Sequence, residues 1–282
     1  MPVCWLSLHN LYSTLSYFSG HFVLEYIHME INVAVAKTNK YAISESGDTL
    51  EVVERPNGGV SVVLADGQTS GRGAKAISSM VVRKVIGLLA EGVRDGAAAR
   101  AASDHLFTER NGKVTACLNI LSTDLQTGTI VIARNNPTPV FVAARDKIEC
   151  LSAESKPIGT SRNIRPAISE IPLEAGVTIV MYTDGVFYAG DRYGQQLDIC
   201  PMLHSLIEDQ DPSAQLIADT VLNHAIRLDQ GRPNDDMSIV VLKVQARETD
   251  QIRRMNVRLP FRATGSMLLR ESFLMEDDQT MN

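Results

Sequence analysis

Short apolar runs bounded by turn residues predict the strands of this chain. The first run is Ile31 to Ala36, and two further runs, TLEVVE and GVSVVLAD, are separated by the turn signal PNGG. Two strands joined by such a turn form a β-hairpin, and the second strand of this hairpin ends in an acid, Asp66.

The spacing of the apolar residues becomes that of a helix after Gly73. The apolar positions that recur at helical intervals are Ile77, Met80, Val81, Val85, Leu88 and Leu89. A second, alanine-rich helical stretch then extends to about Phe107. We therefore expect two helices directly after the hairpin.

Strand patterns return in the second half of the chain. VTACLNILSTD, GTIVIARN and TPVFVAARD, joined by QTG and NNP turns, are typical of an antiparallel meander. A strand at Ile168 to Leu173 leads through EAG into VTIVMYTD, which ends at Asp184. Helices are expected at about Leu197 to Glu208 and Ser213 to Leu228, and the last strand, MSIVVLKV, follows RPNDD.

Antiparallel strands with two inserted pairs of helices predict an α+β layered domain, and the lack of regular βαβ alternation disfavours a parallel dinucleotide-binding fold. With 282 residues, of which 44% are hydrophobic, the chain can bury a large core. Its formal net charge of -6 argues against a nucleic-acid surface, which needs clustered positive charge. The expected partner is a protein or a small molecule.

The two ends of the chain differ from the centre. Residues 1–28 contain no Lys or Arg and are rich in aromatic residues, so neither a secretory signal nor a membrane anchor is indicated and a cytoplasmic protein is expected. We interpret residues 1–28 as a dispensable extension or the product of a start placed too early; the alternative is an apolar segment that docks a partner. Residues 29–246 form the expected domain, and residues 247–282 a tail.

Acids lie at the ends of three apolar strands, and this pattern predicts a metal site. SVVLAD ends at Asp66 and VTIVMYTD ends at Asp184, each followed by a glycine, and DDMSIVVLKV begins at Asp235 and Asp236. Carboxylates crowded at one sheet edge repel one another unless a cation lies between them. A set of oxygen ligands without His or Cys selects Mg²⁺ or Mn²⁺. Gly67, which follows Asp66, lets the backbone turn sharply, so its own carbonyl could face such an ion.

Each of these signals has an alternative explanation. Asp-Gly after a strand is a common turn, and the combination of two such pairs with the DD sequence favours metal binding. Gly71, Arg72 and Gly73 open the first helix, where amide groups and the guanidinium could bind an anion, although an ordinary flexible helix start fits equally well. Thr183 and Ser238 are expected to hydrogen-bond beside the acids rather than to act as nucleophiles.

The order of these motifs resembles a known family. DGQTSGRGA at Asp66, PIG at Pro157, YTDGV at Tyr182 and DDMS at Asp235 are similar to motifs of the metal-dependent protein phosphatase superfamily (type 2C). Within it, they resemble the bacterial SpoIIE-like branch that includes RsbU and RsbX. SGD, which ends at Asp48, and NNPTPVFV are similar to two further motifs of that branch, and the likeness spans roughly Met29 to Val244.

The resemblance implies a four-layer αββα sandwich, in which helices flank an antiparallel β-sandwich, with two Mn²⁺ or Mg²⁺ ions at one edge. By motif, Asp66 would bridge both ions, the Gly67 carbonyl would complete one ligand shell, and Asp184 and Asp235 would hold the other ion. Asp48 would be an outer ligand. No early arginine matches the phosphate-binding arginine of eukaryotic relatives, and Arg72 or loop amides would replace it.

The function that follows is hydrolysis of phosphoserine or phosphothreonine by a metal-activated water. The resemblance implies a phosphorylated STAS-domain antagonist of an anti-sigma factor as the substrate. Two alternatives remain at this point: a binding module that keeps the fold without turnover, and a metal-dependent hydrolase of a small phosphoester. The presence of all three acids argues against the first alternative.

Overall fold

The computed structural model describes residues 13–18, 21–26, 28–145, 147–209, 211–246, 252–258 and 260. The chain divides into two compact units, residues 1–248 and 249–282. The first unit contains all the helices and strands discussed below.

The first of two five-stranded sheets contains the predicted hairpin. Its strands are β4 (Asp48–Glu54), β5 (Val60–Gly67), β6 (Ala116–Asp124), β7 (Thr129–Asn135) and β10 (Ala167–Pro172), in the order β10-β7-β6-β5-β4. All neighbouring strands are antiparallel, and β4 pairs with β5 across the PNGG turn. In this turn Gly58 adopts a positive φ of 85°, which only glycine reaches without strain. The predicted hairpin is therefore confirmed.

The second sheet brings together strands from both ends of the domain. Its order is β3-β12-β11-β8-β9, with bounds Met29–Thr38, Met237–Ala246, Thr178–Tyr182, Val140–Ala144 and Lys147–Leu151. Here too every neighbouring pair is antiparallel. β9 was not expected from the sequence. Its sequence, KIECL, is partly exposed at the edge of the sheet and lacks a clear apolar pattern.

The predicted three-stranded meander is wrong in its last strand. β6 pairs with β7, but β8 pairs with β9 and β11 in the other sheet. The NNP segment crosses between the sheets instead of turning back, and the Arg134 guanidinium fixes it by donating to the carbonyls of Asn136 and Thr138, both at 2.9 Å. A local apolar pattern predicts a strand but not which sheet it joins, so the sequence could not show the crossing.

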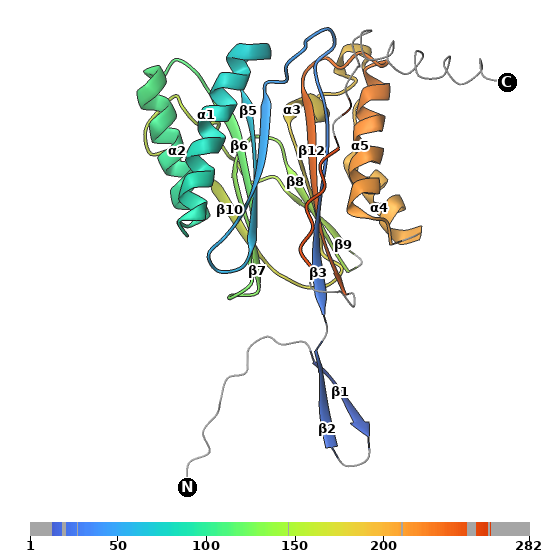
Figure 1. Cartoon of the computed structure of the whole chain (residues 1–282). Helices are drawn as coiled ribbons and strands as arrows, with labels where there is room; N and C mark the ends of the chain where they lie inside the picture. The colour runs from blue at the N-terminus through green and yellow to red at the C-terminus, as the bar shows by residue number, and fades with distance from the viewer. Residues whose placement is uncertain are drawn as a thin grey trace, which may run out of the picture. The chain divides into compact units, whose positions relative to one another are not determined.

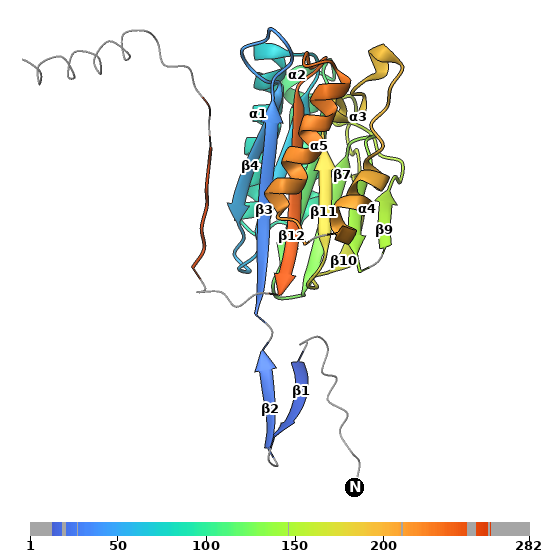
Figure 2. The ribbon, with the colours of Figure 1, turned by 90° about the vertical axis from the view of Figure 1, so that its right-hand side faces the viewer.

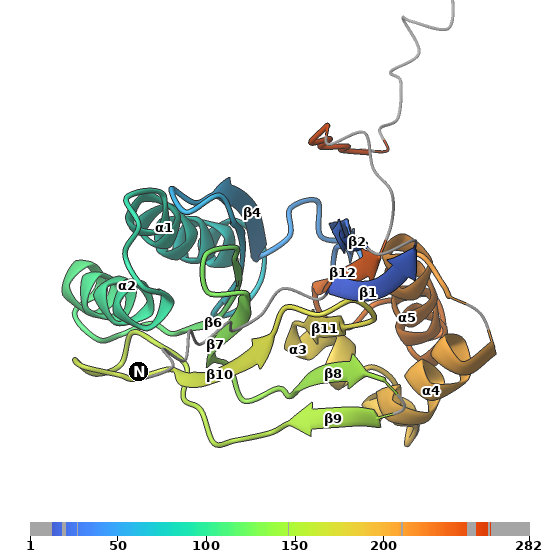
Figure 3. The same cartoon turned by 90° about the horizontal axis from the view of Figure 1, so that it is seen from below.

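Helices cover the outer face of each sheet. α1 (Gly71–Ala90) and α2 (Asp95–Arg110) pack on the first sheet, while α3 (Asp184–Phe187), α4 (Ile199–Asp209) and α5 (Ala214–Leu228) pack on the second. Figure 1 shows the two helix pairs on opposite sides of the sheets, and Figure 3 shows the layers from below. In Figure 2, α5 lies along β3, β12 and β11. The four-layer αββα sandwich is therefore confirmed.

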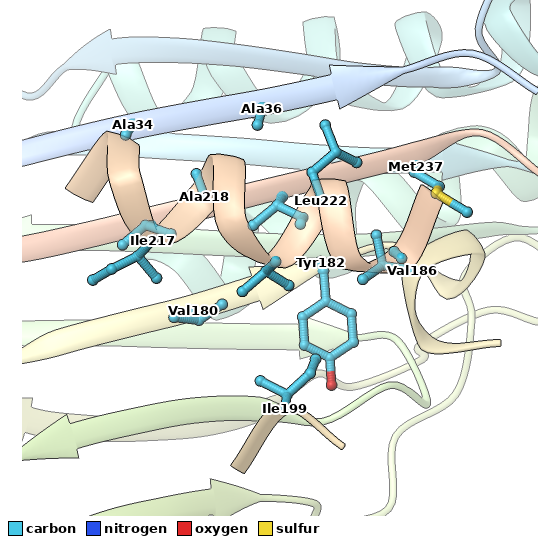
Figure 4. Packing of buried hydrophobic residues seen from close by; sticks show 14 of the residues in the cluster. Ala34, Ala36, Val180, Tyr182, Val186, Ile199, Ile217, Ala218, Leu222 and Met237 are labelled. Carbon is cyan, nitrogen blue, oxygen red and sulfur yellow. The ribbon is translucent and has the colours of Figure 1, made fainter. Parts of the chain in front are cut away.

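Three apolar layers hold the sandwich together. Between the sheets, Val62, Leu64 and Leu121 face residues such as Ile179, Met181 and Val240. A second layer joins the first sheet to α1 and α2, and a third joins the second sheet to α4 and α5. In Figure 4, Ile217 of α5 lies over Val180 of β11, and the Tyr182 ring extends toward Ile199. These rigid layers position the loops at the ends of the strands.

The N-terminal region contains a pairing that the sequence did not predict. Within the described part of residues 1–28, β1 (Ser13–Phe18) pairs antiparallel with β2 (His21–Tyr26) as a separate two-stranded sheet. The expected tail falls largely outside the described residues. No helix in the described ranges combines the length and apolar character that crossing a bilayer requires.

Candidate metal centre

The predicted acids lie at one edge of the sandwich, on elements from both sheets. Asp66, the penultimate residue of β5 in the first sheet, pairs with Asp48, the first residue of β4. In the second sheet, Asp184 begins α3 just after β11, and Asp235 lies two residues before β12. β11 and β12 are neighbours, and the Thr183 amide donates to the Ser238 carbonyl at 3.0 Å, which holds their ends together.

The side chains of these acids meet. Burial, together with the negative charges of Asp48, Asp184 and Asp235 and a direct contact with the Asp184 carboxyl group, raises the pKa of Asp66 to about 10. Burial also raises the pKa of Asp235, and the charge of Asp184 adds to this effect. The structure thus brings the three predicted ligands Asp66, Asp184 and Asp235 close enough for the charge of Asp184 to oppose the ionisation of the other two.

Asp48 lies deeper than these three acids and links the two sheets. It is fully buried, and its Oδ2 atom accepts hydrogen bonds from Ser238 Oγ at 2.6 Å and Thr183 Oγ1 at 3.1 Å. Its Oδ1 atom is buried without a hydrogen-bond partner in the structure. Burial raises the pKa of Asp48 to about 6, against the lowering effect of the Ser238 hydrogen bond. The prediction that Thr183 and Ser238 are hydrogen-bond partners is confirmed.

Asp236, the neighbour of Asp235, binds backbone amides of a loop. Its Oδ1 accepts from the Lys40 amide at 2.9 Å and its Oδ2 from the Gly47 amide at 2.7 Å. Both oxygens of this buried carboxylate therefore hold the 39–47 loop, which leads into Asp48. Two adjacent acids that look equivalent in sequence thus separate into one that faces Asp184 and one that orders a loop.

The glycines after the first two acids are required by close backbone contacts. A Cβ atom on Gly67 would lie 2.1 Å from the Ala74 carbonyl oxygen, and one on Gly185 would lie 2.2 Å from the Asp236 carbonyl oxygen. The first contact lets the start of α1 approach the end of β5, and the second lets α3 approach Asp235 and Asp236. These Asp-Gly pairs therefore do more than turn the chain, because they allow the acid-bearing segments to pack together.

The predicted anion-binding loop lies beside this edge. Gly71 and Gly73 begin α1, and the Arg72 side chain is 95% exposed, 3.8 Å from Glu45 Oε2. The backbone before the helix is strained at Thr69, which has a φ of 78°, whereas Gly71 adopts its φ of 70° without strain. The structure places Arg72 in solvent, so its predicted role in phosphate binding stays a prediction.

Two lysines at this edge were missed by the sequence reasoning. Lys37, on β3, donates to the Asp48 carbonyl at 2.6 Å, and Lys75, on α1, donates to the same oxygen at 2.9 Å. Burial lowers the pKa of Lys37, while the charges of Asp48 and Asp236 oppose that effect. The only signal in the sequence concerned Lys37, which lies near the end of an apolar strand. A lysine in that position usually indicates no more than a solvent-exposed strand end.

The donor set fits hard divalent cations. It consists of carboxylates with a main-chain carbonyl nearby, and it includes a buried carboxylate oxygen, Asp48 Oδ1, that lacks a partner. In the described part of the chain, no group of three or more His, Cys, Asp or Glu side chains is arranged so that it could hold a metal ion without further movement. Mg²⁺ and Mn²⁺ retain several waters and need few protein ligands, so such a partial shell is compatible with them.

Comparison with solved structures defines the class of protein. The chain is similar to the PP2C phosphatase domain with a fragment of the regulatory domain of SpoIIE from Bacillus subtilis, at 21% identity and a TM-score of 0.68, over 78% of this chain and 65% of that one. RsbX in complex with magnesium aligns with a TM-score of 0.59 at 16% identity, over 78% of this chain and 100% of that one. PstP, a serine/threonine protein phosphatase catalytic domain in complex with two manganese ions, aligns with 0.60 at 14% identity, over 77% and 100%. The fold is that of PP2C-type phosphatase domains.

The family follows from the sequence match. The chain belongs to the SpoIIE family, since residues 56–245 match the family of stage II sporulation protein E. It is 26% identical over 215 residues to stage II sporulation protein E of Priestia megaterium, and 24% identical over 227 residues to that of Bacillus subtilis. Each match covers 76% of this chain, but only 36% and 27% of the respective relatives, so the chain spans about a third of their length.

Proposed function

We propose that this chain is a metal-dependent protein phosphatase that hydrolyses phosphoserine or phosphothreonine with two divalent cations, Mn²⁺ or Mg²⁺. The observation that carries the proposal is the meeting of Asp66, Asp184 and Asp235 at one sandwich edge, beside the unpartnered Oδ1 of buried Asp48. A metal-free protein has no evident reason to crowd these carboxylates, since their mutual repulsion opposes folding.

The ligand roles that we propose follow from the resemblance of the motifs that contain these acids. Asp66 would bridge the two ions, the Gly67 carbonyl would complete one shell, and Asp184 and Asp235 would hold the second ion. Asp48 would act as an outer ligand. Support for the cations comes from two neighbours of similar fold, one in complex with magnesium and one with two manganese ions.

When bound, the cations would supply an acidified water as the nucleophile and positive charge to stabilise the phosphoryl group in transit. The residues of the chain position these components. Thr183 and Ser238 fix one oxygen of Asp48, and Asp236 holds the loop before it. Lys37 and Lys75 place two ammonium groups beside the acids, where they offset part of the negative charge.

The substrate we propose is a phosphorylated protein, and the SpoIIE family membership favours a STAS-domain antagonist of an anti-sigma factor. A cytoplasmic location is part of this proposal, as is the division into an extension at 1–28, a phosphatase domain at 29–246 and a tail at 247–282.

The test of the activity is hydrolysis of an aryl phosphate by the full chain. We expect turnover with Mn²⁺ or Mg²⁺, loss of turnover with a chelator, and recovery when the metal is restored. Asp184→Asn is the matched control, because it removes one ligand charge while keeping the side-chain volume. Metal-independent hydrolysis, or equal activity in Asp184→Asn, would contradict the proposal.

The test of the substrate class compares kcat/KM for a phosphorylated STAS protein, its derived phosphopeptide and a panel of phosphorylated metabolites. We expect the folded protein to be preferred, because recognition must then come from surfaces around the rigid site. Preference for a metabolite by a hundredfold would favour the small-phosphoester hydrolase instead.

A further inference from the structure

The exposed face of α1 carries a row of cations. The buried residues of α1, among them Ala74, Ile77, Val81 and Val85, face the first sheet. The opposite face lines an open hollow of about 780 Å³, together with the end of α2. The cationic side chains of this hollow are Arg72, Lys75, Arg83, Lys84 and Arg110, and His105 also lines it. We call this hollow the basic groove.

The positive charge of the basic groove is largely uncompensated. Its one acid, Glu45, lies near Arg72, and Lys75 donates to the Asp48 carbonyl and Thr49 Oγ1. Among the described residues, no ion pair involves Arg83, Lys84 or Arg110. A concentration of free cations in a chain of net charge -6 is a local feature that opposes the average charge of the protein.

The groove begins at the acid cluster. Lys75 belongs to both, since it lines the groove and donates to the carbonyl of Asp48 at 2.9 Å. The first turn of α1 also packs against Gly67, because Ala74 lies in the closest contact with this glycine. A chain that occupies the groove would therefore lead directly toward the edge where the acids lie.

We propose that the basic groove docks an acidic segment of the phosphorylated protein substrate and so contributes to substrate selection. This inference rests on the proposed phosphatase function and names the recognition surface for it. From Arg72 to Lys84 the helix rises roughly 18 Å, which an extended segment of about five or six residues would span. The remaining lining residues, Ala76, Ser79 and Met80, are small or flexible and leave room for a main chain.

Other anionic partners fit the groove less well. Single-stranded nucleic acid is usually bound by aromatic side chains on which bases stack, and none lines the groove. A membrane-binding face would need exposed apolar side chains to insert beside the cations, and Met80 and Ala76 alone do not supply them. An acidic peptide needs only the charge and the length that the groove offers.

The test uses the full chain with Arg83→Glu and Lys84→Glu combined, since both side chains are exposed on α1 and neither contacts the acid cluster in the structure. The matched control combines Arg100→Glu and Lys147→Glu, two exposed positions outside the groove that give the same change in net charge. The probes are fluorescent phosphoserine peptides with six aspartates on one side or the other of the phosphoserine, and a version with six alanines.

Binding is measured by fluorescence anisotropy in a chelator, and hydrolysis of the same peptides and of an aryl phosphate is measured with Mn²⁺. For wild type and the control variant, we expect at least one aspartate peptide to bind and react about tenfold better than the alanine peptide, with an advantage that added salt reduces. The groove variant should lose this advantage but hydrolyse the aryl phosphate at the wild-type rate.

Three outcomes would overturn the docking proposal: no preference for either aspartate peptide in the wild type, an equal loss in both variants, or tighter binding of a 20-nucleotide single strand or of anionic phospholipid vesicles that depends on Arg83 and Lys84. Failure of the phosphatase function itself would appear separately, as absence of aryl phosphate hydrolysis in the wild type. The anisotropy measurement still reports on the groove in that case.

Discussion

The two ends of the β4–β5 hairpin place acids in opposite electrostatic surroundings. At one end, Asp48 and Asp66 face further acids, Asp184 and Asp235, across the sandwich edge. At the other end, Arg55 donates to Asp95 at 3.0 Å, and both side chains are only 8% exposed. Ser122 also donates to Asp95, so this buried carboxylate has its countercharge and hydrogen bonds within the fold.

The difference separates a stabilising arrangement from a functional one. The Arg55–Asp95 pair is self-sufficient, and losing one partner would leave a buried charge without compensation. Among the described residues, the charge of the acid cluster is offset in part by Lys37 and Lys75, which contact the main chain of Asp48, and by Lys40, whose charge acts on Asp235. We infer that the Arg55–Asp95 pair contributes to folding, whereas the acid cluster needs cations from solution to balance its charge.

The largest effect should come from removing a ligand charge. We expect Asp66→Asn, Asp184→Asn and Asp235→Asn each to reduce metal-dependent turnover by about a hundredfold or more, because the loss weakens metal binding and the acidity of its water together. Aryl phosphate kinetics measure turnover, and circular dichroism checks that each variant is folded. Wild-type turnover in any two of these variants would remove the ligand assignment.

At the other end of the hairpin, we expect a substitution to lower stability and to leave turnover unchanged. Arg55→Met should lower the free energy of unfolding by about 3–5 kcal/mol, since Asp95 then loses its buried partner. Turnover per folded molecule should stay close to that of wild type, because Arg55 lies away from the acids. Urea unfolding gives the stability, and the double variant Arg55→Met/Asp95→Asn serves as the control, which should lose less than Arg55→Met alone.

Stability without metal should depend on pH in a direction set by the acid cluster. The folded-state pKa of Asp66 is raised to about 10 from its ordinary value of 3.8, so the folded state prefers the protonated form. The contribution of Asp66 to the free energy of unfolding is fully present below about pH 4 and is lost as the pH rises toward 10.

Thermal unfolding in a chelator should therefore show a melting temperature that falls as the pH is raised through this window. Asp66→Asn should flatten that decline, since the amide does not ionise, and saturating Mn²⁺ should do so in the wild type. An equally steep decline in the metal-free Asp66→Asn variant would show that another group controls the dependence.

A smaller effect distinguishes the two adjacent acids before β12. Asp236→Asn keeps one oxygen acceptor for the 39–47 loop, and we expect a loss of turnover of only a few-fold, against the hundredfold loss in Asp235→Asn. Asp236→Ala removes both acceptors and should cost more than Asp236→Asn in thermal stability as well, since two backbone amides lose their partner. Equal kinetic losses in Asp235→Asn and Asp236→Asn would contradict the division of roles.

The smallest effect is expected from deleting residues 1–28. A chain that begins at Met29 retains every strand of the two five-stranded sheets and all the acids, so its turnover and melting temperature should match those of the full chain. Activity assays and thermal unfolding on both chains provide the comparison. An insoluble or inactive shortened chain would show that the N-terminal segment packs on the domain.

The sequence by itself determined the local elements and the chemistry at their ends. The short apolar runs in GVSVVLAD and MSIVVLKV specified strands, the helical spacing from Ile77 to Leu89 specified α1, and the strand-end positions of Asp66, Asp184 and Asp235 pointed to one site. These features depend on a residue and its near neighbours, so they can be inferred without knowing what packs against them.

Only the tertiary structure decided which strands share a sheet and what each polar side chain contacts. The transfer of β8 to the second sheet, the separate tasks of Asp235 and Asp236, and the approach of Lys37 to Asp48 all depend on contacts between distant segments. The Asp236 carboxylate, for instance, binds an amide 189 positions away. Such pairings leave no local pattern, because their free energy comes from burial and geometry that exist only once the layers have packed.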